Sequence, residues 1–223
     1  MSAQPDVVVV GGGPVGLLVA SELALNGVAV TLVERLAETV DQPKAGTLHA
    51  RAAQSLRRRG YLPPGPLEGP PGAVARSPFH FAAQRTFEIT SPLAEGAPVV
   101  GRWQGDLERF LEAVCLARGV QVLRGTSVVA IEPGTTGARL ELESERDGPS
   151  VLTPDWVVGA DGARSIVRAA AGIGATDQPA TMRALLGRVT LLDPDRAPVG
   201  WHETPRGWTL VNRAIDADGT SRL

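Results

Sequence analysis

The order of apolar and polar residues predicts a strand, a helix and a second strand at the start of the chain. Residues 6–10 form a β-branched apolar run, which is typical of a central parallel strand, and residues 28–34 form another. Between them, residues 14–26 are apolar nearly all round, which predicts a buried helix that Gly27 ends. This alternation indicates an α/β fold with a parallel sheet.

The same patterns predict the remaining elements. Residues 104–118 form an amphipathic helix with one apolar face, made by Leu107, Phe110, Leu111, Val114 and Cys115. A helix over residues 47–59 stops at Gly60, and a short one after residue 162 stops at Gly172. We expect strands over residues 120–123, 127–132, 138–143, 151–158, 183–192 and 207–213, edge strands within 78–100, a loop over 62–72 and a turn near 205–207.

Composition narrows the class of protein. The chain has 223 residues and a net charge of −2, which gives no reason to expect nucleic acid or an anionic membrane as a partner. There is no long apolar run and no basic leader, and the single cysteine, Cys115, allows no internal disulfide, so we expect a cytoplasmic protein. His80 and His202 have no second ligand at metal spacing, so no metal site is expected.

A glycine turn follows the first strand and indicates a dinucleotide site. Gly11, Gly13 and Gly16 satisfy G-x-G-x-x-G, and Glu34 follows Gly16 by 18 residues at the end of the second strand. Glycine permits the tight turn, the close approach of a pyrophosphate and the packing of helix on strand, and the helix N-terminus attracts the phosphates. A carboxylate at Glu34 would bind ribose and repel a 2′-phosphate. The motif therefore indicates FAD or NAD, and it argues against NADP in this site.

A second motif carries the resemblance to a family. The segment WVVGADGARSIVR, residues 156–168, places Asp161 and Gly162 in a turn between a strand and a helix. Together with GGGPVG at 11–16, PKAGTLHAR at 43–51 and Gln104 at the start of the long helix, it resembles the class A FAD-dependent aromatic monooxygenases of the para-hydroxybenzoate hydroxylase type. Among these, the sequence is most similar to the bacterial hydroxylases of aromatic polyketide antibiotics.

The resemblance implies a set of cofactor contacts. The turn would hold the FAD pyrophosphate, Glu34 would bind the adenosine ribose, and Arg35 would lie beside the adenine. The loop at Lys44, where the family often has arginine, would reach the flavin side. Asp161 and Gly162 match a motif associated with FAD and NADPH. The full set of implied residues is Gly11, Gly13, Pro14, Val15, Gly16, Glu34, Arg35, Lys44, Ala45, Gly46, Gln104, Val128, Asp161 and Gly162.

The resemblance also implies an activity. In this family NADPH reduces FAD, and the reduced flavin takes up dioxygen to form a C4a-hydroperoxide that hydroxylates an aromatic substrate. The implied fold is a Rossmann-like FAD-binding domain, residues 1–75 and 100–172, with the start of an antiparallel β-sheet substrate domain, residues 76–99 and 173–223. No catalytic residue is assigned, because the cofactor carries the chemistry.

One departure from the family leaves two hypotheses open. The family has a third cofactor motif, a Gly-Asp turn roughly a hundred residues beyond Asp161, and this chain contains no such turn. We therefore expect a chain that lacks the C-terminal half of the family fold. It is either part of an FAD- and NADPH-dependent monooxygenase or a non-catalytic remnant that binds the ADP end of FAD. An NAD-dependent dehydrogenase is a third reading, which leaves Gln104 and Asp161 unexplained.

Overall fold

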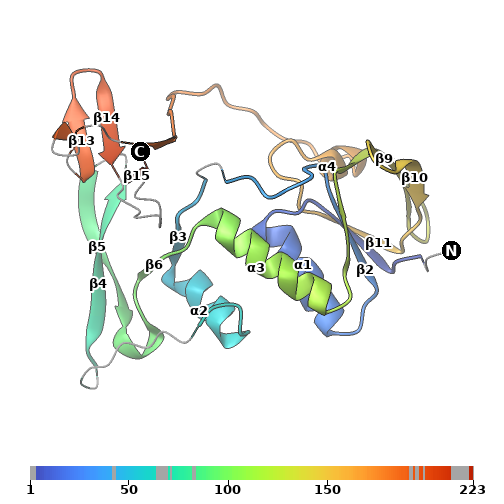
Figure 1. Ribbon diagram of the computed structural model, residues 1–223, viewed down its shortest axis with the longest axis horizontal. Helices are drawn as coiled ribbons and strands as arrows, with labels where there is room; N and C mark the ends of the chain where they lie inside the picture. Colours follow the sequence, from blue (N-terminus) through green and yellow to red (C-terminus); the bar gives the residue numbers. More distant parts are fainter. Residues whose placement is uncertain are drawn as a thin grey trace. The chain divides into compact units, whose positions relative to one another are not determined.

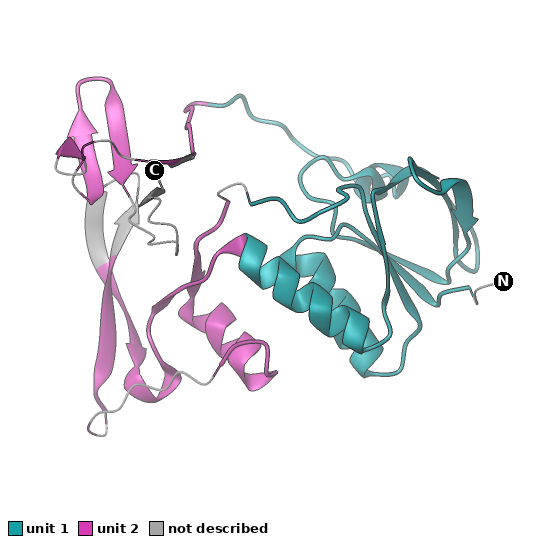
Figure 2. Ribbon diagram, viewed as in Figure 1, with its two compact units in different colours: residues 1–41, 105–180 teal, residues 42–104, 181–223 magenta. Residues whose placement is uncertain are grey.

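The chain divides into two compact units. The computed structural model describes residues 4–41, 44–63, 70, 72–81, 84–190, 193, 196–197, 199–211 and 221–222. The first unit comprises residues 1–41 and 105–180, and the second comprises residues 42–104 and 181–223 (Figure 2). This division assigns residues 42–75, 100–104 and 173–180 differently from the sequence-based domain boundaries, whose functional meaning stays a prediction.

A four-stranded parallel sheet forms the centre of the first unit. Its strands are β1 (Val7–Val10), β2 (Val30–Glu34), β7 (Gln121–Arg124) and β11 (Trp156–Gly159), in the order β11-β1-β2-β7. β1 pairs in parallel with β2 on one side and with β11 on the other. All four residues of β1 are buried, as expected for a β-branched strand covered on both faces. The predicted α/β class is confirmed.

Two helices of the first unit pack against each other. α1 (Pro14–Leu25) and α3 (Gln104–Ala117) lie side by side (Figure 1), and the Cys115 thiol donates a hydrogen bond to the Leu17 carbonyl at 3.1 Å. Leu107, Leu111 and Cys115 are buried, as predicted. The prediction that α1 is a buried helix holds for one face only: Gly16, Leu17, Ala20 and Ser21 are buried, whereas Val15 and Leu25 are exposed.

A three-stranded antiparallel sheet contributes to the same core. It consists of β8 (Thr126–Pro133), β9 (Ala138–Ser144) and β10 (Gly148–Leu152), in the order β10-β9-β8. Its residues Leu140 and Leu142 form one buried cluster with Val8, Val10 and Val33 of the parallel sheet. The short helix α4 (Ile166–Ala170) follows β11 and contacts both β11 and β8. The parallel sheet is therefore anchored to β8, the strand that forms one wall of the site described below.

The second unit consists mainly of paired short strands. β3 (Thr47–His49) pairs with β6 (Val99–Gly101), and β13 (Gly200–Thr204) forms a hairpin with β14 (Gly207–Val211). The other elements are α2 (Ala50–Arg58), the hairpin β4 (Val74–Phe81) and β5 (Gln84–Pro92), η1 (Leu93–Glu95), and the pair β12 (Arg188–Val189) and β15 (Ser221–Arg222).

Three predicted elements differ from the structure. Residues 47–49 are a strand, because they pair with distant β6, and only the remainder of 47–59 is helical. The strand predicted over 151–158 is split at Pro154: β10 pairs with β9 and β11 with β1, so the chain changes sheets there. Of the strand predicted over 183–192, only Arg188–Val189 is paired, and residues 191–192 lie outside the described residues.

Other local predictions are confirmed. Gly27, Gly60 and Gly172, which end the three predicted helices, all have positive φ, with values of 81°, 76° and 68°. The turn predicted near 205–207 joins β13 to β14, although β13 itself was not predicted. The loop predicted over 62–72 falls largely outside the described residues, as does the end of the strand predicted over 207–213. Among the helices described, none is long and apolar enough to span a membrane.

Gly16 is expected to be indispensable for stability. A Cβ at this position would lie 1.9 Å from the Gly11 carbonyl oxygen, a backbone atom that cannot move aside alone. Gly16→Ala should therefore cost at least about 1–3 kcal/mol, the usual cost of overpacking, and lower the midpoint of thermal unfolding by several degrees. Gly174→Ala is the control, because a Cβ there meets open space. Equal stability of the two variants would contradict this packing.

Cys115 is expected to be unreactive in the folded protein. It is fully buried, and burial raises the pKa of its thiol to about 11, so the nucleophilic thiolate is scarce at neutral pH. A thiol reagent such as DTNB should label native protein only as fast as it unfolds, and denatured protein at once. Rapid stoichiometric labelling of the native chain would show that α3 does not pack this residue against α1.

Candidate functional site

The sheet order brings three loops to one edge of the first unit. Because β1 lies between β2 and β11, the residues that follow these three parallel strands meet at their carboxyl ends. The glycine turn, Glu34 with Arg35, and Asp161 are thus neighbours in space. Ligands of open α/β sheets bind at this edge, at the strand where the order reverses.

Backbone packing explains two of the fingerprint glycines. Gly11 has φ +109°, and a Cβ there would lie 2.4 Å from the Ala160 carbonyl oxygen. A Cβ on Gly16 would lie even closer to backbone, 1.9 Å from the Gly11 carbonyl oxygen. These positions therefore hold the end of β1, the start of α1 and the turn after β11 together, which confirms the predicted tight turn and close packing.

Gly13 differs from the other two glycines. A Cβ there would meet nothing within 4 Å among the described residues, and its φ of −73° suits any residue. Gly13 is the N-cap of α1, where backbone N–H groups lack partners within the helix, and Pro14 and Val15 follow it. The open space in front of this N-terminus is compatible with the predicted pyrophosphate contact.

Glu34 bridges two turns with its carboxylate. Oε2 accepts a hydrogen bond from the Gly12 N–H at 2.5 Å, and Oε1 accepts one from the Leu36 N–H at 2.9 Å. Each carboxylate oxygen has a second lone pair for a ribose hydroxyl. Gly12 is a residue that sequence reasoning missed. The only signal for it was its place as the middle glycine of the GGG run at residues 11–13.

Asp161 organises the turn that leads into α4. Its Oδ1 accepts the Ser165 hydroxyl at 2.6 Å, and its Oδ2 accepts the Ile166 N–H at 2.7 Å. The Ser165 hydroxyl in turn caps the helix by accepting the Arg168 N–H at 2.9 Å. Gly162 has φ +82°, as an Asp-Gly turn requires. The structure thus shows turn chemistry at Asp161, and its contact with a cofactor stays a prediction.

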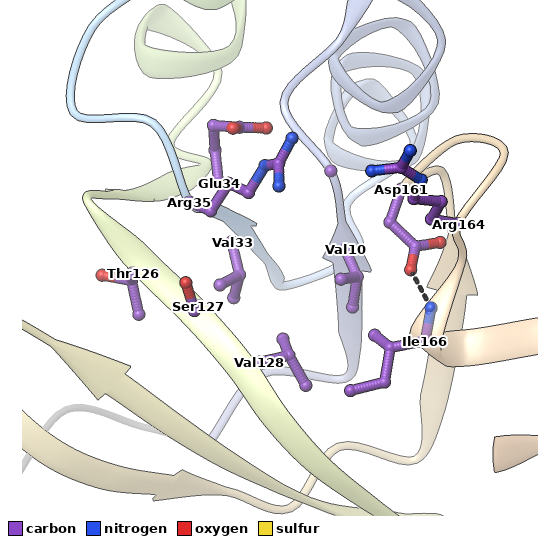
Figure 3. Close-up of a pocket in the computed structure, with 11 residues that line it drawn as sticks. Val10, Val33, Glu34, Arg35, Thr126, Ser127, Val128, Asp161, Arg164 and Ile166 are labelled. Carbon is purple, nitrogen blue, oxygen red and sulfur yellow. Dashed lines mark hydrogen bonds between the residues drawn. The ribbon is translucent and has the colours of Figure 1, made fainter. Parts of the chain in front are cut away.

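The edge pocket lies among these loops. This cavity of about 350 Å³ is lined by Val10, Gly11, Val33, Glu34, Arg35, Thr126, Ser127, Val128, Asp161, Arg164 and Ile166. In Figure 3, apolar side chains of β1, β2, β8 and α4 form its lower part, and charged groups lie at the strand ends above them. An apolar surface beside a few polar groups is typical of sites for small organic molecules.

Two arginines give the edge pocket positive charge. Arg35 and Arg164 lie on opposite sides of it (Figure 3), and neither side chain hydrogen-bonds or pairs with another described residue. Both guanidinium groups are exposed and therefore available to anions. Arg164, Thr126, Ser127 and Ile166 were not predicted. The sequence offered one signal for them: they lie close to predicted site residues. Arg164 and Ile166 follow Asp161, and Thr126 and Ser127 precede Val128.

An ion pair fixes the strand that forms one wall of the pocket. The Arg124 guanidinium, at the end of β7, contacts Glu112 of α3 through two short bonds, of 2.6 Å and 2.7 Å, and also donates to Thr39. The Glu112 carboxylate raises the pKa of Arg124 above its usual value, against the opposing effect of burial. This bidentate pair holds the β7–β8 turn, which places Thr126, Ser127 and Val128.

The other predicted contacts lie close together in the second unit. The Gln104 N–H donates to the Ala45 carbonyl at 3.0 Å, and the Ala45 N–H donates to Gln104 Oε1 at 3.4 Å. Gly46 accepts from the Arg102 N–H at 3.0 Å, and a Cβ there would lie 2.6 Å from the Trp103 ring. Lys44, Ala45, Gly46 and Gln104 thus form one local cluster, and their roles toward a cofactor stay predictions.

The donor set of the edge pocket suits a nucleotide, and no metal centre is found among the described residues. An acid for ribose hydroxyls, an open glycine turn for phosphates and an apolar surface for a base are all present. The pocket volume falls at the lower end of the range for small-molecule sites, about 300–1,000 Å³. Within the described ranges, no group of three or more His, Cys, Asp or Glu side chains could hold a metal ion.

Comparison with known proteins identifies the family. The family described as "FAD binding domain" matches residues 4–211. The chain is 35% identical over 216 residues to the uncharacterized aromatic compound monooxygenase YhjG of Bacillus subtilis strain 168, covering 95% of this chain and 42% of that protein. This match selects FAD over NAD, the alternative that the first motif left open.

Solved structures agree with this family. CabE, an aromatic hydroxylase from angucycline biosynthesis, matches with a TM-score of 0.74 and 31% identity, covering 99% of this chain and 43% of that one. Aklavinone-11 hydroxylase, solved with FAD and aklavinone, matches with a TM-score of 0.58 and 26% identity, covering 77% and 36%. The chain spans less than half the length of these relatives. It belongs to the FAD-binding domain family of FAD-dependent aromatic monooxygenases.

Proposed function

We propose that the edge pocket holds the adenosine diphosphate half of FAD, and that the whole protein hydroxylates an aromatic, polyketide-like compound with NADPH as reductant. The observation that carries the first part is the pocket itself, in which Glu34, the glycine turn and an apolar surface converge. The relatives, which are named aromatic hydroxylases and monooxygenases, support the second part.

Different residues of the edge pocket would bind different parts of the cofactor. Val10, Val33, Val128 and Ile166 would contact the adenine, and Glu34 would accept hydrogen bonds from the ribose. The N-terminus of α1 would receive the pyrophosphate, with Arg35 and Arg164 adding positive charge. When bound, FAD supplies the redox chemistry of hydroxylation, with dioxygen as oxidant. The protein supplies orientation and exclusion of water.

The second unit contributes a separate part of the proposal. Lys44–Gly46 and Gln104 are held together by the hydrogen bonds between Ala45 and Gln104. The family resemblance implies a cofactor contact for this cluster. Residues 76–99 and 173–223 would form the substrate-binding sheet. Residues 1–75 and 100–172 would form the cofactor-binding domain.

The nucleotide preference of the edge pocket tests the proposal. FAD bound to the chain, followed by its fluorescence, should be displaced by ADP, because the pocket recognises the half that the two molecules share. The analogue 2′,5′-ADP should bind at least about tenfold more weakly than 5′-AMP, or about 1.4 kcal/mol, because the two molecules differ only in the 2′-phosphate, which would meet the Glu34 carboxylate. If ADP does not displace FAD, the pocket is wrongly assigned. If 2′,5′-ADP binds as well as 5′-AMP, the charge of Arg35 outweighs that of Glu34.

Gly13 provides a variant that separates binding from folding. A Cβ at this position meets open space in the protein but would enter the volume proposed for the pyrophosphate. Gly13→Ala should therefore leave the unfolding midpoint nearly unchanged while weakening ADP about tenfold or more, as measured by calorimetry. Gly174→Ala again serves as the control. Undiminished ADP affinity of the Gly13 variant would place the pyrophosphate elsewhere.

A further inference from the structure

The Glu34 carboxylate is already engaged within the protein. Its two oxygens accept the backbone N–H groups of Gly12, at 2.5 Å, and of Leu36, at 2.9 Å. Gly12 belongs to the glycine turn after β1, and Leu36 belongs to the loop after β2. One side chain thus ties together the two backbone segments between which a nucleotide would lie. A carboxylate that accepts backbone N–H groups makes stronger hydrogen bonds than a neutral acceptor does.

The packing of Gly12 agrees with this tie. A Cβ at position 12 would lie 2.8 Å from both Cβ and Cγ of Glu34 and 3.1 Å from Oε2, and Gly12 is buried. Gly12 occupies an unspecified position of the G-x-G-x-x-G fingerprint, so the fingerprint alone does not explain why it is glycine. The Glu34 side chain, which lies directly against it, supplies the reason.

We propose that Glu34 is a positioning residue for the glycine turn, in addition to its role toward ribose. By holding the Gly12 N–H, it fixes the path of residues 11–13 and so keeps the N-terminus of α1 open to phosphate before any cofactor binds. This inference rests on the proposed function in one point, which is that the glycine turn is the phosphate site. The hydrogen bonds themselves require no ligand.

The two roles make opposite predictions for a ligand that lacks ribose. If Glu34 only binds ribose, Glu34→Gln removes a negative charge near the phosphate site, and inorganic pyrophosphate should bind more tightly or equally well. If Glu34 holds the turn, the variant should bind pyrophosphate more weakly. The amide of glutamine has one accepting oxygen, and its NH₂ group would face a second N–H donor, so one of the two bonds is lost.

The experiment compares four variants of the same chain. These are Glu34→Gln, Gly12→Ala, the double variant, and Glu38→Gln as the control, which makes the same chemical change at an exposed position four residues later. Thermal unfolding without ligand and calorimetric binding of ADP and inorganic pyrophosphate are measured for each. We expect Glu34→Gln to unfold several degrees lower and to bind both ligands more weakly, with ADP weakened about tenfold. The Glu38 variant should match the original protein.

The double variant tests whether the two residues act through one contact. Gly12→Ala should displace Glu34, so the loss of stability in the double variant should be smaller than the sum of the two single losses. An unchanged unfolding midpoint for Glu34→Gln, or pyrophosphate binding that stays equal or tightens, would overturn the positioning role and leave ribose binding intact. Failure of the unaltered chain to bind ADP or FAD would instead overturn the proposed function, while a lowered unfolding midpoint would still support the positioning role.

Discussion

The site depends on two close backbone contacts of Gly11, which leave no room for a side chain at Gly11 or at Gly16. Its carbonyl oxygen lies where a Cβ on Gly16 would be, and its own missing Cβ would lie 2.4 Å from the Ala160 carbonyl oxygen. These contacts pack the start of α1 and the turn after β11 against the end of β1, although Ala160 is far from Gly11 in the sequence. Any larger side chain at Gly11 or Gly16 would separate these elements, and with them the walls of the edge pocket.

The two acids that line the pocket, Glu34 and Asp161, already accept hydrogen bonds from the protein before any ligand binds. Glu34 joins the turns after β1 and β2, and Asp161 holds Ser165 and the first N–H group of α4. Groups that are fixed in this way need little reorganisation when a ligand arrives, which favours binding because less entropy is lost. The free guanidinium groups of Arg35 and Arg164 are different. They are exposed, have no described partner, and are available to respond to the phosphates.

The sequence predicted most of the first unit but not its long-range pairings. The central strands, α1 and α3 follow from local periodicity, and Gly11, Gly16 and Glu34 follow from a motif whose spacing is set by one strand–helix–strand unit. The division of 151–158 between two sheets and the strand at 47–49 depend on partners far along the chain, which periodicity does not reveal. Gly12 was missed for the same reason, since it matters through its contact with Glu34, and Arg164 was missed because only the fold places it at the edge pocket. The functional roles of Lys44, Ala45, Gly46 and Gln104 stay predictions, although the structure places these residues together.

The most direct test is a crystal structure of this chain with ADP. We predict that the adenine lies against Val10, Val33, Val128 and Ile166, that the ribose hydroxyls contact Glu34, and that the phosphates lie at Gly13 and the N-terminus of α1. A Gly12–Glu34 hydrogen bond retained in that complex would agree with the positioning role. ADP bound away from the carboxyl ends of β1 and β2, or with its phosphates turned from the glycine turn, would contradict the assignment of this pocket to FAD.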